Sequence, residues 1–126
     1  MRKRLFCVGL VLIGILTCQW AAAVNQVDVT IDKGCVLKYD DGTSADPVEA
    51  DRNDFVVWHN SRVSEAVVIT FTGASPFSVS EITVPANGQV SRQVRSDAEE
   101  TDYDFDLTCG GDTRTGPKLS IGGGGP

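Results

Sequence analysis

Histidine and methionine are almost absent from this chain of 126 residues: His59 is the single histidine and Met1 the single methionine. Zinc sites in proteins are built mainly from histidine and cysteine, so one imidazole without a paired thiolate supplies too few ligands. No motif places a nucleophile beside His59, which argues against hydrolytic catalysis. We therefore expect a protein that is not an enzyme.

Helical periodicity is also missing, because no segment carries twelve residues with apolar side chains at helical spacing. Alternation of apolar and polar residues recurs instead, between segments rich in Gly, Pro and Asp. It predicts short strands at 27–31, 35–39, 55–60, 66–71, 81–84, 89–94, 103–109 and 118–121. Residues 40–54 form an acidic connection with room for a short edge strand. Seven to eight such strands predict an all-β antiparallel sandwich, with a core that includes Trp58, Phe71, Tyr103 and Phe105.

Basic residues are scarce, and three of the eleven stand together at Arg2–Arg4. The apolar run Leu5–Cys18 follows them, and then come the small residues Ala21–Ala23. The run is shorter than the roughly 20 residues that a membrane-spanning helix needs. The pattern predicts a signal peptide at 1–23 that is cleaved after Ala23. Lipidation at Cys18 is the alternative, since ILTC loosely resembles a lipoprotein cleavage box.

The mature chain, residues 24–126, would carry 8 basic and 17 acidic residues, a net charge of −9. Such an acidic domain repels phosphate backbones, so nucleic acid is excluded as a partner. We expect a periplasmic or secreted monomer without a transmembrane segment. It would consist of a sandwich at 24–121 and a flexible glycine-rich tail at 122–126.

Cleavage would leave two cysteines, Cys35 and Cys109. Two cysteines in an exported domain most often pair, so we expect one disulfide. A crosslink that closes so long a loop contributes up to about 4.5 kcal/mol in the chain-entropy model.

From Asp54 onward the chain resembles a cupredoxin, the Greek-key sandwich of plastocyanin-like and azurin-like proteins. DFVVWHN resembles the family's strand that ends in an aromatic residue and Asn, and VVITF resembles the next strand. SPF resembles the Pro-Phe loop, VPANGQV the turn after it, and YDFDLTCGGDTRTGPKLSI the terminal ligand loop. An immunoglobulin-like domain is a minor alternative, because the order Cys35, Trp58, Cys109 fits but the spacing does not.

The resemblance implies a copper centre that this sequence does not complete. The family's first histidine falls at Val67, the thiolate at Cys109, the second histidine at Asp112 and the methionine near Pro117. Blue copper requires two imidazoles and a thiolate. We therefore expect no metal and no cofactor. The alternative is a degenerate metal site that uses Cys109 and Asp112, with His59 as a further candidate ligand.

A calcium site is a second alternative, because Asp102, Asp104 and Asp106 alternate along one strand and share a face. The glycine and terminal glutamate of a tight calcium loop do not follow them, so a solvated acidic face is the simpler interpretation. Further ligands would have to come from Asp40, Asp41, Asp46, Glu49, Asp51 and Asp54.

These observations together predict an exported, metal-free cupredoxin-like module that binds an unknown protein or small molecule, or has a structural role. The alternative function is a metal-binding envelope protein. Three loops, Ser61–Glu65, Gly73–Phe77 and Gly110–Gly116, are expected to form one recognition surface at one end of the sandwich.

Overall fold

The structure is a computed structural model that describes residues 6–8, 17–19, 25–60 and 64–122. Two short strands, β1 (Phe6–Val8) and β2 (Thr17–Gln19), pair antiparallel within the expected signal peptide. The remainder of the expected signal peptide lies outside the described residues, as does the tail beyond Gly122.

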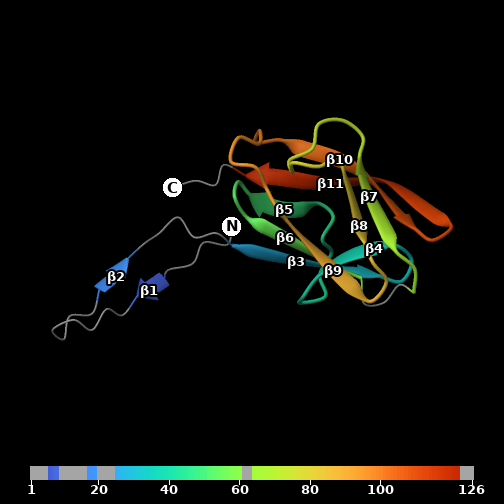
Figure 1. The fold of residues 1–126 in the computed structure, drawn as a ribbon, viewed down its shortest axis with the longest axis horizontal. Helices are drawn as coiled ribbons and strands as arrows, with labels where there is room; N and C mark the ends of the chain where they lie inside the picture. The colour runs from blue at the N-terminus through green and yellow to red at the C-terminus, as the bar shows by residue number, and fades with distance from the viewer. Residues whose placement is uncertain (1–5, 9–16, 20–24, 61–63, 123–126) are drawn as a thin grey trace.

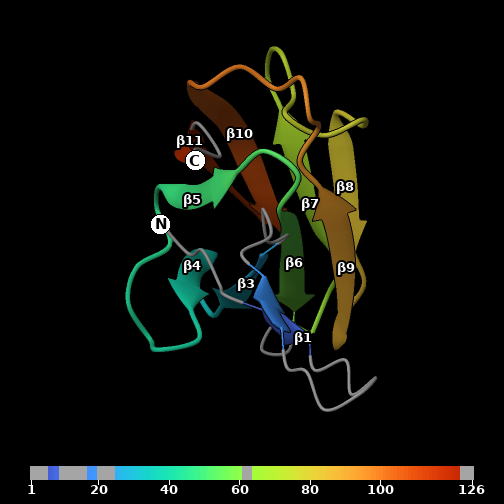
Figure 2. The ribbon, with the colours of Figure 1, turned by 90° about the vertical axis from the view of Figure 1, so that its left-hand side faces the viewer.

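Nine strands of the described region form two facing sheets. In the view of Figure 1, β10 and β11 of one sheet are at the top, and β3 and β4 of the other sheet are below them. One sheet has the order β5–β11–β10–β7–β8 and the other β4–β3–β6–β9, as Figure 2 shows from the side. No helix occurs among these residues. The strands are β3 (Gln26–Asp32), β4 (Val36–Tyr39), β5 (Val48–Asp51), β6 (Phe55–Asn60), β7 (Val67–Phe71), β8 (Glu81–Val84), β9 (Gly88–Gln93), β10 (Asp102–Cys109) and β11 (Asp112–Gly122).

The all-β sandwich is confirmed, but the expected count of seven to eight strands is too low. The ninth strand is β5, which forms in the acidic connection because Val48 and Ala50 are buried there. It pairs with β11 in parallel, with Val48 opposite Leu119. The other sheet also contains one parallel pair, β3 with β6. The sandwich is therefore antiparallel except for one pair in each sheet.

Side-chain alternation along the strands produces the core between the sheets. β3 buries Val27, Val29 and Ile31 and leaves the residues between them half exposed. The four residues expected in the core are all buried: Trp58, Phe71, Tyr103 and Phe105. Three of these rings meet at its centre. The centroid of the Phe105 ring lies 5.9 Å from that of Trp58 and 5.4 Å from that of Phe71.

The expected disulfide is confirmed, and it joins the two sheets at one end. Cys35 lies in the turn between β3 and β4, and Cys109 is the last residue of β10. Their Cα atoms are 5.8 Å apart. The φ angle of Cys35 is 63°, an unusual conformation for a residue with a side chain. Within the described residues no helix has the length and apolar character needed to cross a bilayer.

Candidate functional site

The strand register assigns each expected recognition loop to an end of the sandwich. Val67 at the start of β7 pairs with Cys109, whereas Phe71 at its finish pairs with Phe105. Residues 61–63 of the expected loop Ser61–Glu65 lie outside the described residues. Residues 64–66, just before β7, and the turn after β10 lie at the end that carries the disulfide. We call this the disulfide end; it comprises residues 33–35, 64–66 and 109–112. Gly73–Phe77 follows β7 and lies at the opposite end, so the expectation of one surface formed by all three loops is wrong.

A tight turn replaces the polar loop that was expected after Cys109. Cys109 pairs directly with Asp112, so only Gly110 and Gly111 separate β10 from β11. Gly110 has a φ angle of 59°, a conformation that glycine adopts without a steric penalty. The rest of the expected Gly110–Gly116 loop belongs to β11. The register shifts between Asp104 and Asp106, opposite Gly116 and its neighbours, which marks a β-bulge in this hairpin.

Glu65, two residues before β7, lies against the turn after Cys109. Its carboxylate lies so close to the Gly110 main chain that a Cβ atom at Gly110 would overlap it. The segment that carries Glu65 is held by Asn60, the last residue of β6. The Asn60 side-chain amide lies 2.8 Å from the Glu65 carbonyl oxygen and 3.3 Å from those of Val84 and Pro85. Asn60 is fully buried, so these contacts lie in a region with little solvent.

A cavity of about 380 Å³ opens at the disulfide end. Lys33, Glu65 and Asp112 give it mixed charge, and no aliphatic or aromatic side chain appears among its described lining residues. The lining consists of Lys33, Gly34, Cys35, Ser64, Glu65, Cys109, Gly110, Gly111 and Asp112. Its walls are therefore polar side chains, the disulfide and glycine main chain.

The four positions that correspond to the copper ligands do not converge. Val67 is fully buried beside Cys109, and Asp112 is exposed on the neighbouring strand. Pro117 lies near Phe105 in the hairpin, four strand residues from Cys109, or about 13 Å. The sulfur of Cys109 is bonded to that of Cys35. Of the expected alternative ligand set, only Cys109 and Asp112 are neighbours.

His59 lies apart from these residues. It is on the outer face of β6, next to the buried Trp58, and its Nε2 atom is 3.0 Å from the Asp28 carboxylate. It lines a different cavity, of about 320 Å³, together with Thr30, Asp40, Asn87, Gly88 and Gln89. His59 is therefore a surface residue paired with a carboxylate, away from Cys109 and Asp112.

The acidic face of β10 is paired in part with basic groups. Lys118 on β11 forms an ion pair with Asp104 at 2.6 Å, and the hydrogen bond and charge of that carboxylate raise the pKa of the lysine. Asp102 is exposed and Asp106 half-buried. In the part of the chain that the structure describes, no three His, Cys, Asp or Glu side chains form a group that could hold a metal ion.

The comparison with known proteins concerns the fold. No protein-family model and no curated protein matches the chain. Among solved structures, the reduced Cu(I) form of an amicyanin variant at pH 4 matches with a TM-score of 0.50 and 18% sequence identity. The match covers 79% of this chain and 85% of the amicyanin, which is a cupredoxin. The sandwich has a cupredoxin-like fold. At this level of identity the similarity extends to the fold alone.

Proposed function

We propose that the chain is an exported, metal-free cupredoxin-like module that binds a protein partner through its disulfide end and carries out no catalysis. The observation that carries this proposal is the bond between Cys35 and Cys109. Cysteine binds a metal ion as the thiolate. The sulfur of Cys109 is in a disulfide and therefore cannot form a thiolate. The position that matches the copper thiolate is thus used to join the two sheets.

The lining of the disulfide end favours a protein over a small molecule. Sites for small molecules are mostly apolar and aromatic, with a few polar groups that fix orientation. The cavity here has mixed charge from Lys33, Glu65 and Asp112 and no aliphatic or aromatic wall among its described residues. The rim of a protein–protein interface is polar and accessible to solvent, so these groups would contact a partner at the rim.

Export is supported by the N-terminal pattern and by the disulfide, which persists in oxidising compartments such as the periplasm. The expected product begins at Val24, and the mass of the intact protein recovered outside the cytoplasm tests this. A mass that includes residues 1–23 would contradict the export proposal. A mass that fits a lipid-modified Cys18 would favour the alternative of an envelope lipoprotein.

Copper titration tests the metal-free state. We expect that adding Cu²⁺ to the purified mature protein produces no thiolate-to-copper charge-transfer band. The matched control is Cys35→Ser, which leaves Cys109 as a free thiol at the same place and shows whether the measurement detects a thiolate there. A band in the unmodified protein would support the alternative function, a metal-binding envelope protein with a degenerate site.

A further inference from the structure

The edge strands of the two sheets differ in whether the rest of the chain covers them. β4 and β5 lie at one side of the sandwich, and β8 and β9 lie at the other (Figure 2). An uncovered edge strand presents unpaired N–H and C=O groups, with which a further strand can pair. The uncovered edges therefore indicate where the protein could accept a strand from a partner.

The edge of β4 is covered by the segment that follows it in the chain. The Ala45 N–H donates a hydrogen bond to the Leu37 carbonyl at 3.0 Å. The Tyr39 N–H donates to the Thr43 carbonyl at 2.8 Å. The outward main-chain groups of β4 thus have partners within the fold.

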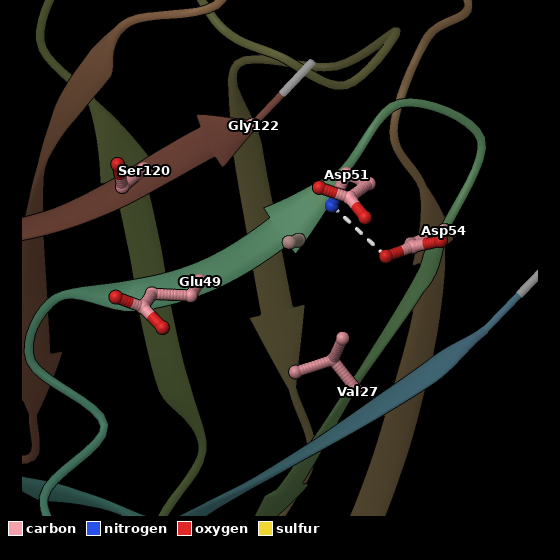
Figure 3. Close-up of a pocket in the computed structure, with 7 residues that line it drawn as sticks. Val27, Glu49, Asp51, Asp54, Ser120 and Gly122 are labelled. Atoms are coloured by element: carbon pink, nitrogen blue, oxygen red, sulfur yellow. Dashed lines mark hydrogen bonds between the residues drawn. The ribbon is translucent and has the colours of Figure 1, made fainter. Parts of the chain in front are cut away.

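Side chains cover the edge of β5. The Glu49 N–H donates a hydrogen bond to the Tyr39 hydroxyl at 2.9 Å. The Asp51 N–H donates to the Asp54 carboxylate, also at 2.9 Å, which is the dashed line in Figure 3. Both outward donors of β5 therefore have acceptors, and this side of the sandwich offers little to a further strand.

The edge of β9 is not covered. Main-chain groups in an antiparallel pair point alternately towards the partner strand and away from it. The N–H of Val94, just after β9, donates to the Asp54 carbonyl on the β6 side at 2.8 Å, which fixes the alternation. The residues whose N–H and C=O groups point away from β6 are therefore Gln89, Ser91 and Gln93. Among the described residues, none of these groups has a hydrogen-bond partner.

β8 is also uncovered, but it is shorter and carries a charge. It has four residues, against six in β9. The Phe71 N–H donates to the Ser80 carbonyl at 2.8 Å, so alternation leaves Glu81 and Thr83 of β8 facing outward. A charged side chain on a short edge strand is a common protection against pairing. β9 is therefore the edge that is better suited to accept a strand.

Arg92 gives β9 a positive charge that the fold does not neutralise. Its side chain is exposed and lies on the same face of the strand as Val90, which packs against the core. The basic side chains that pair with carboxylates, at 2.6–3.8 Å, are Lys38, Arg52, Arg95, Arg114 and Lys118. Arg92 has no such partner in the described part of the chain, although acidic residues outnumber basic ones by 17 to 11. This unpaired charge is complementary to a carboxylate on a partner.

We propose that β9 accepts an extended segment of a protein partner as an additional antiparallel strand, with a carboxylate opposite Arg92 and an apolar side chain opposite Val90. The main-chain groups of Gln89, Ser91 and Gln93 would bond to the segment, as in other sheets that bind extended peptides. Arg92 and Val90 would occupy non-hydrogen-bonded positions, where facing side chains are closest. In an antiparallel segment, the acidic residue precedes the apolar one by two positions.

The test uses the purified mature protein and a synthetic peptide, acetyl-Thr-Thr-Glu-Thr-Val-Thr-Thr-amide. The peptide can place its Glu opposite Arg92 and its Val opposite Val90. We expect saturable binding that slows amide hydrogen exchange at Gln89, Ser91 and Gln93, because strand pairing protects the N–H groups that face the peptide. NMR measures both. The proposal is wrong if no binding occurs up to the solubility limit of the peptide, or if these three amides are not protected.

Ser91→Pro removes the central outward N–H without removing a hydrogen bond to β6, so the protein should still fold. It should bind the peptide at least about tenfold more weakly. Thr83→Pro makes the same change on the edge of β8 and serves as the matched control, with no expected effect on binding. N-methylation of the central Thr of the peptide removes the donor opposite Ser91 without changing the protein, and it should weaken binding similarly. Binding that neither Ser91→Pro nor N-methylation weakens would contradict strand addition.

Arg92→Gln tests the charge. It should weaken binding of the Glu peptide about two- to fivefold and leave binding of a peptide with Gln in place of Glu unchanged. If Arg92 only protects the edge from pairing, the substitution would leave binding of both peptides unchanged or strengthen it, and the proposal would be wrong. Self-association of the protein that Ser91→Pro abolishes would assign the edge to a second copy of the chain and would also overturn it.

This inference goes beyond the proposed function and does not rest on it. None of residues 88–93 lines the cavity at the disulfide end. The copper titration and the mass of the mature protein can therefore fail while the peptide binds at β9, and the reverse is equally possible.

Discussion

The side-chain amide of Asn60 donates a hydrogen bond to the main-chain carbonyl of Glu65 at 2.8 Å, which ties the last residue of β6 to the segment before β7. Two further carbonyl oxygens, of Val84 and Pro85, lie 3.3 Å from the same nitrogen. One buried amide therefore connects three segments beside the disulfide end. Replacing Asn60 should therefore lower the free energy of unfolding by more than the small size of its side chain suggests.

Asn60→Asp exchanges this donor for a carboxylate that would face three carbonyl oxygens. We expect a loss of about 2–3 kcal/mol in the free energy of unfolding at pH 7. Burial and the carbonyls would raise the pKa of the new carboxyl in the folded state above its unfolded value of about 3.9. The folded state then binds the proton more tightly, so the loss should shrink as the pH falls towards 4. Urea unfolding at both pH values measures this, and equal losses would contradict it.

The disulfide should account for much of the stability of the domain. Cys35→Ser and Cys109→Ser should each lower the free energy of unfolding by up to about 4.5 kcal/mol, because the crosslink no longer restricts the unfolded chain. Urea unfolding of the oxidised, mature protein is the measurement. Reduction of the unmodified protein should give a similar loss, and two reactive thiols before reduction would show that the bond is not formed in solution.

Gly110→Ala should destabilise the protein through two separable effects. The alanine would adopt a φ angle near 59°, at a cost of about 1–2 kcal/mol. Its Cβ atom would also displace the Glu65 carboxylate, which is the flexible end of an exposed side chain. In a Glu65→Ala background only the conformational cost should remain. A double-mutant cycle on unfolding free energies tests this. Gly111→Ala is the control, since an added Cβ atom there would meet no neighbouring atom within 4 Å.

Trp58→Phe should lower the free energy of unfolding by less than the reduction in side-chain size suggests. The Trp58 indole N–H is buried without a partner among the described residues, and its replacement removes that unsatisfied donor. We expect a loss below about 2 kcal/mol, against about 3–5 kcal/mol for Phe105→Ala, which removes the ring at the centre of the core. Thermal or urea unfolding distinguishes the two. A larger loss for Trp58→Phe would mean that the indole nitrogen has a partner in solution.

Local patterns in the sequence predicted the sandwich and the disulfide well. Alternation is a property of each strand taken alone, so strands such as 55–60 and 103–109 were visible without knowledge of their partners. The pairing of Cys35 with Cys109 followed from the small number of cysteines left after the expected cleavage.

The features that depend on long-range register were not visible in the sequence. The sequence left room for a short edge strand within residues 40–54, and β5 is that strand at the edge of its sheet. Its parallel pairing with β11, which places Val48 opposite Leu119 and Asp51 opposite Gly122, could not be predicted. A longer polar loop was expected after Cys109 because this segment resembles the ligand loop of cupredoxins. Two adjacent glycines, Gly110 and Gly111, are the local sequence signal for the tight hairpin that the structure shows there.

The strand directions also determine how the molecule would be displayed if it were attached to a surface. β11 ends at Gly122, at the opposite end of the sandwich from Cys109, and β10 between the two ends is eight residues long, or about 26 Å. If the protein were coupled to a bead or a sensor surface through the chain beyond residue 122, the disulfide end would point away from that surface. Asp112 and Glu65 would then be accessible to a binding partner. Immobilisation for binding assays should therefore use the carboxyl-terminal side.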